Sequence, residues 1–80
     1  MNSNKQNLIN KIIYRSQYRG TKEMDIFVGN FVKSIVYNLP IEDLKDLDFL
    51  INMNDEDIKK ILVGKKEFNN NKIYKLLREF

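Results

Sequence analysis

The sequence predicts an all-α protein, folded as a compact antiparallel bundle of five helices in a single domain. Apolar residues recur at i, i+3, i+4 and i+7 in several segments, which is the spacing of one helix face. The chain lacks the alternation of apolar and polar residues that half-buried strands require. Its 80 residues suffice for one small domain with a modest core, spanning residues 1–80 with residues 1–4 frayed.

The first two predicted helices cover residues 4–17 and 22–38. The apolar face of the first consists of Leu8, Ile9, Ile12 and Ile13. The face of the second consists of Met24, Phe27, Val28, Phe31 and Ile35. Further apolar residues widen this second face, which predicts that the helix is the central one of the bundle. Gly29 lies inside it at a cost of about 1 kcal/mol relative to alanine, and we interpret it as a close helix crossing.

A third helix is predicted from the pair Leu39-Pro40 onward. The residue before a proline is pushed out of the α region, so the second helix ends there. Pro40 suits the first position of the next helix, where Glu42 and Asp43 would lie in the first turn. Its buried stripe is predicted to be Leu44, Leu47, Leu50 and Ile51.

Two shorter helices complete the predicted bundle. Asn54 is the expected cap of the fourth helix, whose first turn is acidic, and Gly64 ends that helix. The asparagines at 69–71 offer caps for the fifth. The apolar stripe of the fifth helix is Ile73, Leu76, Leu77 and Phe80.

The composition excludes several kinds of chemistry. There is no cysteine and no histidine, so disulfides, thiol catalysis and the commonest general base and metal ligand are unavailable. No apolar run approaches the length of about 20 residues that crosses a membrane. The N-terminus has neither the apolar centre of a signal peptide nor the arginines of a transit peptide. We therefore expect a soluble protein without membrane insertion in a reducing compartment.

The net charge of +3 is unevenly distributed along the chain. Residues 1–38 carry six basic and two acidic groups, residues 39–57 carry one and seven, and residues 58–80 carry seven and two. A small basic nucleic-acid-binding protein is the alternative reading, with the third and fourth helices as a helix-turn-helix. The acidic block on those helices argues against it, because a recognition helix must approach phosphates. A protein partner fits better, and we expect no nucleic acid.

The segment between the first two helices, residues 19–25, is called the elbow segment here. Gly20 suits the position just past a helix end, because glycine enters left-handed backbone conformations without a Cβ clash. Thr21 can cap the second helix, which places Glu23 and Asp25 in its first turn, where the helix dipole favours anions. From these preferences alone, Arg19 and Glu23 are ordinary residues of a helix connection.

The elbow segment has the pattern RGxxExD followed by an apolar helix, and the triplet Tyr14-Arg15-Ser16 precedes it. This sequence resembles the small succinate dehydrogenase assembly factors, also called flavinylation factors, of bacteria and mitochondria. Further on, Leu50 and the run 55–62 occupy the places of the family's leucine and its D-P-D-L-x-x-W-L motif. The resemblance covers residues 8–80. The chain departs from it at Glu56 and Ile61, where the family has proline and tryptophan.

The resemblance implies a function and a set of partner-binding residues. Such a protein promotes covalent attachment of FAD to the flavoprotein subunit of succinate dehydrogenase, or to the related fumarate reductase subunit, and is not itself an enzyme. It implies a monomer that binds no cofactor stably, the FAD being in the partner. It is expected in the bacterial cytoplasm, or in the mitochondrial matrix of a eukaryote. The partner-binding residues that it implies are Arg15, Arg19, Gly20, Glu23, Asp25 and Asp57.

Three other patterns have simpler readings. The acidic residues of the third and fourth helices lack the spacing of a calcium loop, so we expect no metal site. The lysines at 59–60 and 65–66 are interpreted as a solvated face. The four tyrosines are expected at the rim of the core, with Tyr14 and Tyr18 bordering a binding surface.

Overall fold

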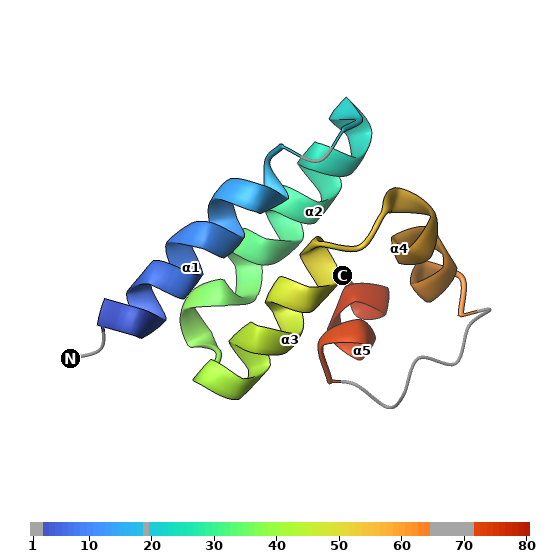
Figure 1. The fold of residues 1–80 in the computed structure, drawn as a ribbon. Coiled ribbons are helices and arrows are strands. Elements are labelled where there is room, and N and C mark those ends of the chain that lie inside the picture. The colour runs from blue at the N-terminus through green and yellow to red at the C-terminus, as the bar shows by residue number, and fades with distance from the viewer. Residues whose placement is uncertain (1–2, 19, 65–71) are drawn as a thin grey trace.

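The apolar stripes of the sequence form five α-helices in the computed structural model, which describes residues 3–18, 20–64 and 72–80 (Figure 1). Within these ranges there is no strand, and the predicted all-α fold is confirmed. The elements are α1 (Ser3–Ser16), α2 (Lys22–Ile35), the 3₁₀ turn η1 (Val36–Asn38), α3 (Ile41–Ile51), α4 (Asp55–Leu62) and α5 (Lys72–Glu79).

Helix α1 packs against both α2 and α3, and α5 packs against both α3 and α4 (Figure 1). The sequence predicted α2 as the central helix. In the structure α3 is at least as central as α2. It packs closely against both α1 and α5, whereas α2 packs closely against α1. The wide apolar face of α2 is only partly buried, since Ile26 is exposed. None of the described helices is long and apolar enough to span a bilayer.

Apart from Phe80, which follows α5 and is 53% exposed, the predicted stripes of all five helices contribute to the core. Phe31 of α2 is its largest fully buried side chain, while Phe27 and Ile35 are half-buried at its edge. Ser16 is the buried polar residue among the described ones, and its hydroxyl donates a hydrogen bond of 2.7 Å to the Ile13 carbonyl oxygen. Fully buried aliphatic side chains come from every α-helix and from η1: Ile12, Val28, Val32, Val36, Leu44, Leu47, Leu50, Ile51, Ile58, Ile61, Ile73 and Leu77.

Two predicted caps are confirmed by hydrogen bonds. The Thr21 side chain accepts from the Met24 amide at 3.3 Å, and the Asn54 side chain accepts from the Asp57 amide at 2.8 Å. Gly64 follows α4 with φ +69°, the left-handed conformation expected after a helix end. Pro40 is the N-cap residue of α3 and not its first helical residue. The predicted caps at 69–71 lie outside the described residues.

The second predicted helix is shorter in the structure than in the sequence pattern. Helix α2 ends at Ile35, whose φ of −126° and ψ of −20° leave the α region, and residues 36–38 continue as the 3₁₀ turn η1. A tighter last turn before Pro40 is consistent with the restriction that a proline imposes on the residues before it.

Candidate functional site

An open groove of about 800 Å³ lies between the end of α1 and the segment that joins α3 to α4. Two helical ends meet there because α1 packs along α3. The N-cap Asn54 then fixes the first turn of α4 at the groove. Its described lining consists of Tyr14, Arg15, Tyr18, Ile51, Asn52, Met53, Asn54, Asp55 and Glu56.

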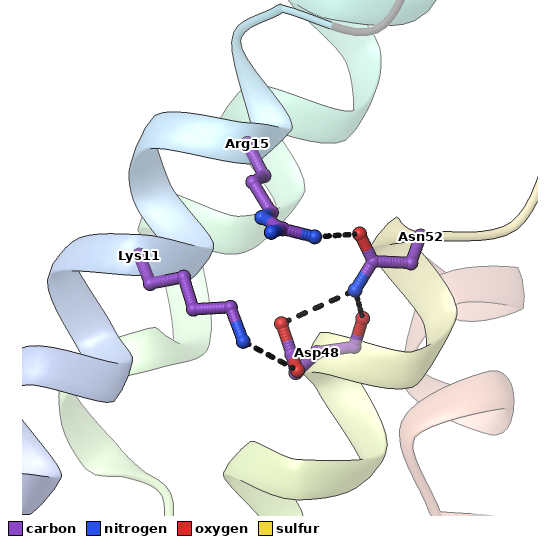
Figure 2. Close-up of polar contacts among 4 residues, drawn as sticks. All are labelled: Lys11, Arg15, Asp48 and Asn52. Atoms are coloured by element: carbon purple, nitrogen blue, oxygen red, sulfur yellow. Dashed lines mark hydrogen bonds and ion pairs between the residues drawn. The ribbon is translucent and has the colours of Figure 1, made fainter.

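A chain of polar contacts joins α1 to α3 beside the groove (Figure 2). Nη1 of Arg15 donates to Oδ1 of Asn52 at 2.7 Å. Nδ2 of Asn52 donates to the Asp48 backbone oxygen at 2.8 Å and to Asp48 Oδ1 at 3.3 Å. The other carboxylate oxygen of Asp48 accepts from Lys11 Nζ at 3.5 Å. Arg15 is therefore held at the groove by a side chain that is itself held in place.

Two aromatic rings form one part of the groove lining. Tyr14 and Tyr18 are separated by one helical turn, and their ring centroids lie 4.8 Å apart. Both rings are about two-thirds exposed, at 66% and 69%. Both tyrosines line the groove, and aromatic side chains that carry a hydroxyl group are common at protein–protein interfaces.

The prediction that the tyrosines lie at the rim of the core is wrong for all four. Tyr14, Tyr18 and Tyr37 are exposed, and Tyr18 lies beyond the end of α1. Tyr74 lies inside the core instead, and its burial, together with the charge of Asp46, raises the pKa of its phenol above the ordinary value of 10.0. Tyr14 and Tyr18 both line the groove, and that they border a binding surface stays a prediction.

The elbow segment follows α1 directly. Gly20 is exposed with φ +153°, in backbone space that side-chain-bearing residues rarely adopt. Glu23 is exposed in the first turn of α2, and Asp25 is half-buried there, its amide bonded to the Thr21 carbonyl at 2.9 Å. These three residues are not part of the described groove lining. Arg19 lies outside the described residues.

The three acidic residues at the start of α4 differ in their surroundings. Asp55 and Glu56 line the groove. Asp57 does not line it; this residue is half-buried, and its amide donates to the Asn54 side chain. Ile61 stands where the family motif has a tryptophan and is fully buried. In this chain that position therefore contributes to the core and leaves no side chain for a surface contact.

The groove combines one guanidinium, two carboxylates, two phenol rings and a backbone segment. Among the described residues there is no group of three or more histidine, cysteine, aspartate or glutamate side chains placed to hold a metal ion. Such a lining can bind and orient another polypeptide by hydrogen bonds, charge and aromatic contact. The sequence analysis found Arg15 but missed Asn52, Asp48 and Lys11. Only the pairing of α1 with α3 brings these residues together, and no local pattern reports that pairing.

The profile of the family described as flavinator of succinate dehydrogenase matches residues 10–80. The chain is 30% identical over 80 residues to the mitochondrial succinate dehydrogenase assembly factor 2 of Arabidopsis thaliana, covering 95% of this chain and 43% of that protein. It is 29% identical over 68 residues to the FAD assembly factor SdhE of Acetobacter pasteurianus, covering 85% of this chain and 62% of that protein.

The mitochondrial assembly factor 2 of Schizosaccharomyces japonicus is 29% identical over 77 residues, covering 91% of this chain and 54% of that protein. The chain thus spans less than two-thirds of the length of these curated relatives. No solved structure matches the chain. Because the family profile covers all but the first nine residues, the chain belongs to the family of flavinators of succinate dehydrogenase.

Proposed function

We propose that this protein promotes the covalent attachment of FAD to the flavoprotein subunit of succinate dehydrogenase. The observation that carries the proposal is the family match over residues 10–80. The names of two relatives, a succinate dehydrogenase assembly factor and an FAD assembly factor, support it. The groove and the elbow segment supply a surface with the chemistry of a protein-binding site.

The proposed mechanism is binding and not catalysis. The chain has no histidine or cysteine and thus lacks the commonest general base and any thiol nucleophile. We propose that it binds the flavoprotein in a conformation that holds the acceptor side chain near the flavin and excludes water. Holding two reacting groups in the right geometry lowers the activation barrier, because the entropy of orienting them is lost on binding and not in the transition state. FAD itself belongs to the partner, and the chain needs no cofactor of its own.

The proposed contact surface has two adjacent parts. In the groove, Arg15 offers a fixed cation, and Tyr14 and Tyr18 offer exposed aromatic area. In the elbow segment, the bare backbone of Gly20 allows close approach, and Glu23 offers an exposed carboxylate. Arg19, Asp25 and Asp57 complete the proposed contact set, which extends the surface from the elbow segment to the start of α4.

The remaining features of the proposal concern the setting. We propose that the chain acts as a monomer, with the flavoprotein subunit of succinate dehydrogenase as its partner and the related fumarate reductase subunit as a second partner. The setting would be the bacterial cytoplasm, or the mitochondrial matrix in a eukaryote. Two of the relatives cited above are named as mitochondrial proteins.

Flavinylation in cells tests the proposal. In a strain that lacks its own flavinylation factor, the wild-type chain should restore covalent FAD on the flavoprotein, read as flavin fluorescence of the denatured band in a gel. Arg19→Ala and Glu23→Ala should both lower that signal. Because Glu23 is exposed, Glu23→Ala should change the free energy of unfolding by about 0.5 kcal/mol or less, as surface substitutions usually do. Glu42→Ala is the matched control, because Glu42 is likewise an exposed glutamate in a helix first turn. It should leave flavinylation intact.

Two results would count against this function. If the wild-type chain restores no covalent flavin, the chain is not a flavinylation factor for that enzyme. If Glu23→Ala and Glu42→Ala lower flavinylation equally and in proportion to lost stability, the elbow segment is a structural connection and not a contact surface.

A further inference from the structure

We propose that Asn52 is a positioning residue for partner recognition, which holds the Arg15 guanidinium at the groove in the orientation that the flavoprotein contacts. This inference rests on the proposed function. It adds a residue to the site that neither the RGxxE pattern nor the acidic start of α4 contains.

The direction of the hydrogen bonds shows how Asn52 holds Arg15. Arginine has only donors, so an acceptor must hold it, and Oδ1 of Asn52 accepts from Nη1 at 2.7 Å. The carboxamide that carries this oxygen cannot turn freely, because its Nδ2 donates to two oxygens of Asp48. These bonds assign the amide nitrogen to Asp48 and the amide oxygen to Arg15 (Figure 2). Lys11 pairs with Asp48 at 3.5 Å and thereby restrains the carboxylate that holds Asn52.

The contact between Asn52 and Arg15 lies at the groove. The Arg15–Asn52 bond lies on the exposed surface, where hydrogen bonds and ion pairs add little to folding stability. Its more consequential effect is on the freedom of Arg15, a side chain with many rotamers. Arg15 and Asn52 both line the groove, so the ordered guanidinium is presented at the place where a partner would lie. One Nη1 bond leaves the guanidinium further N–H groups to donate to partner oxygens.

An arginine that is ordered before binding favours affinity. A partner that binds a mobile arginine must order it, and ordering one such side chain at an interface weakens binding. An arginine that is already held in the unbound protein avoids that loss. Replacing Asn52 should therefore reduce affinity about three- to tenfold, the range expected for ordering one long side chain. The reduction should depend on the presence of Arg15.

The main test is a double-mutant cycle in binding. Affinity for the purified flavoprotein subunit without covalent FAD is measured by calorimetry for wild type, Asn52→Ala, Arg15→Ala and the double variant. We expect each single variant to bind more weakly and the double variant to bind no more weakly than Arg15→Ala, because Asn52 acts through Arg15. Asn10→Ala is the control. It removes an exposed side-chain hydrogen bond of similar length on α1, in which Gln6 Nε2 donates to Asn10 Oδ1 at 3.0 Å. It should bind as wild type.

A second measurement needs no partner, and its first comparison needs no variant. In the wild-type chain, nuclear magnetic resonance should show slower guanidinium rotation for Arg15 than for Arg78, an exposed arginine for which the structure gives no side-chain hydrogen bond among the described residues. In Asn52→Ala the two arginines should become equally mobile.

The outcomes separate this inference from the function on which it rests. If wild type fails to bind the flavoprotein, the proposed function fails and the recognition role of Asn52 fails with it. If wild type binds but Asn52→Ala binds equally well, or if the two substitutions weaken binding additively, the positioning role is overturned. Equal mobility of Arg15 and Arg78 in the wild-type chain would overturn it as well.

Discussion

The rings of Phe31 and Phe80 meet edge to face, with centroids 5.5 Å apart at an interplanar angle of 66°. Phe27 meets the same Phe80 ring at 5.7 Å and 65°. Two residues of α2 thereby bind the residue that follows α5, and they join helices that are distant in the sequence. Phe31 is almost fully buried, whereas Phe80 remains 53% exposed, so the two rings should differ in their contribution to stability.

Phe31→Ala should lower the free energy of unfolding by about 3–5 kcal/mol, because it leaves a large cavity in a small core. Phe80→Ala should cost about 1–2 kcal/mol through its lost aromatic pairs. Urea unfolding followed by circular dichroism measures both. Phe49→Ala is the control, since Phe49 is exposed on α3, and it should stay within about 0.5 kcal/mol. An unchanged midpoint for Phe31→Ala would contradict the core assignment.

Gly29→Ala should stabilise the protein. Gly29 is buried inside α2, and a Cβ there would lie 3.8 Å from the Ser16 carbonyl oxygen and 4.0 Å from Gln17 Cγ, which is ordinary contact. Alanine then raises the helix propensity by about 1 kcal/mol without a clash. The melting midpoint should rise, and a fall would show that the crossing of α1 and α2 needs glycine.

Gly20→Ala should have the opposite effect. Its added Cβ meets no atom within 4 Å, so the whole cost comes from φ +153° and should be about 1 kcal/mol or more. We also expect lower flavinylation, because the elbow backbone would change conformation. Comparing equal protein amounts at a temperature well below the midpoint separates the two effects. Unchanged stability would contradict the positive φ.

Asn54→Ala should destabilise α4 by about 1 kcal/mol, because it removes the oxygen that accepts from the Asp57 amide. Asn54→Asp, which keeps a capping oxygen, should retain most of the stability. Hydrogen exchange of the α4 amides measures the local effect. Since Asp55 and Glu56 of the same turn line the groove, fraying should also weaken partner binding. Equal exchange in Asn54→Ala and wild type would show that the cap is not needed.

Stability should fall in alkaline solution because of Tyr74. Its pKa in the folded protein lies above 10.0, raised first by burial and then by the charge of Asp46. The folded state therefore keeps this proton while the unfolded state releases it. The stabilisation is complete below the unfolded pKa of about 10 and is lost as pH rises through the folded value. Urea unfolding at pH 9 and pH 11 should show a larger loss for wild type than for Tyr74→Phe; an equal loss would contradict the shift.

The helices were predictable because their signals are local. The caps at Thr21 and Asn54 and the apolar stripes depend on residues within one or two turns of each other, which a sequence displays directly. The 3₁₀ turn after Ile35 was not predicted, since Val36 continues the apolar stripe and its tighter geometry arises only before Pro40.

The groove was not predictable in the same way. The elbow segment could be found through its pattern, but the bond from Arg15 to Asn52 joins residues that are 37 positions apart. The tyrosines illustrate the same limit. Tyr14 lies two positions beyond the buried Ile12 and faces solvent, whereas Tyr74 lies next to the buried Ile73 and is itself buried. Which side of a helix is buried depends on the helices that pack against it, and the sequence of the helix alone does not reveal them.

The groove has walls from two distant parts of the chain, and this has a consequence for the protein's lifetime. Since α1 and α3 form the groove only when they are docked, the unfolded chain has no such site, and any ligand of the groove binds the folded state alone. Such a ligand shifts the folding equilibrium by mass action. Small domains have little stability to spare, and cellular proteases remove chains that open. An occupied chain should therefore persist longer than an unoccupied one, so the amount of this protein would follow the amount of its partner.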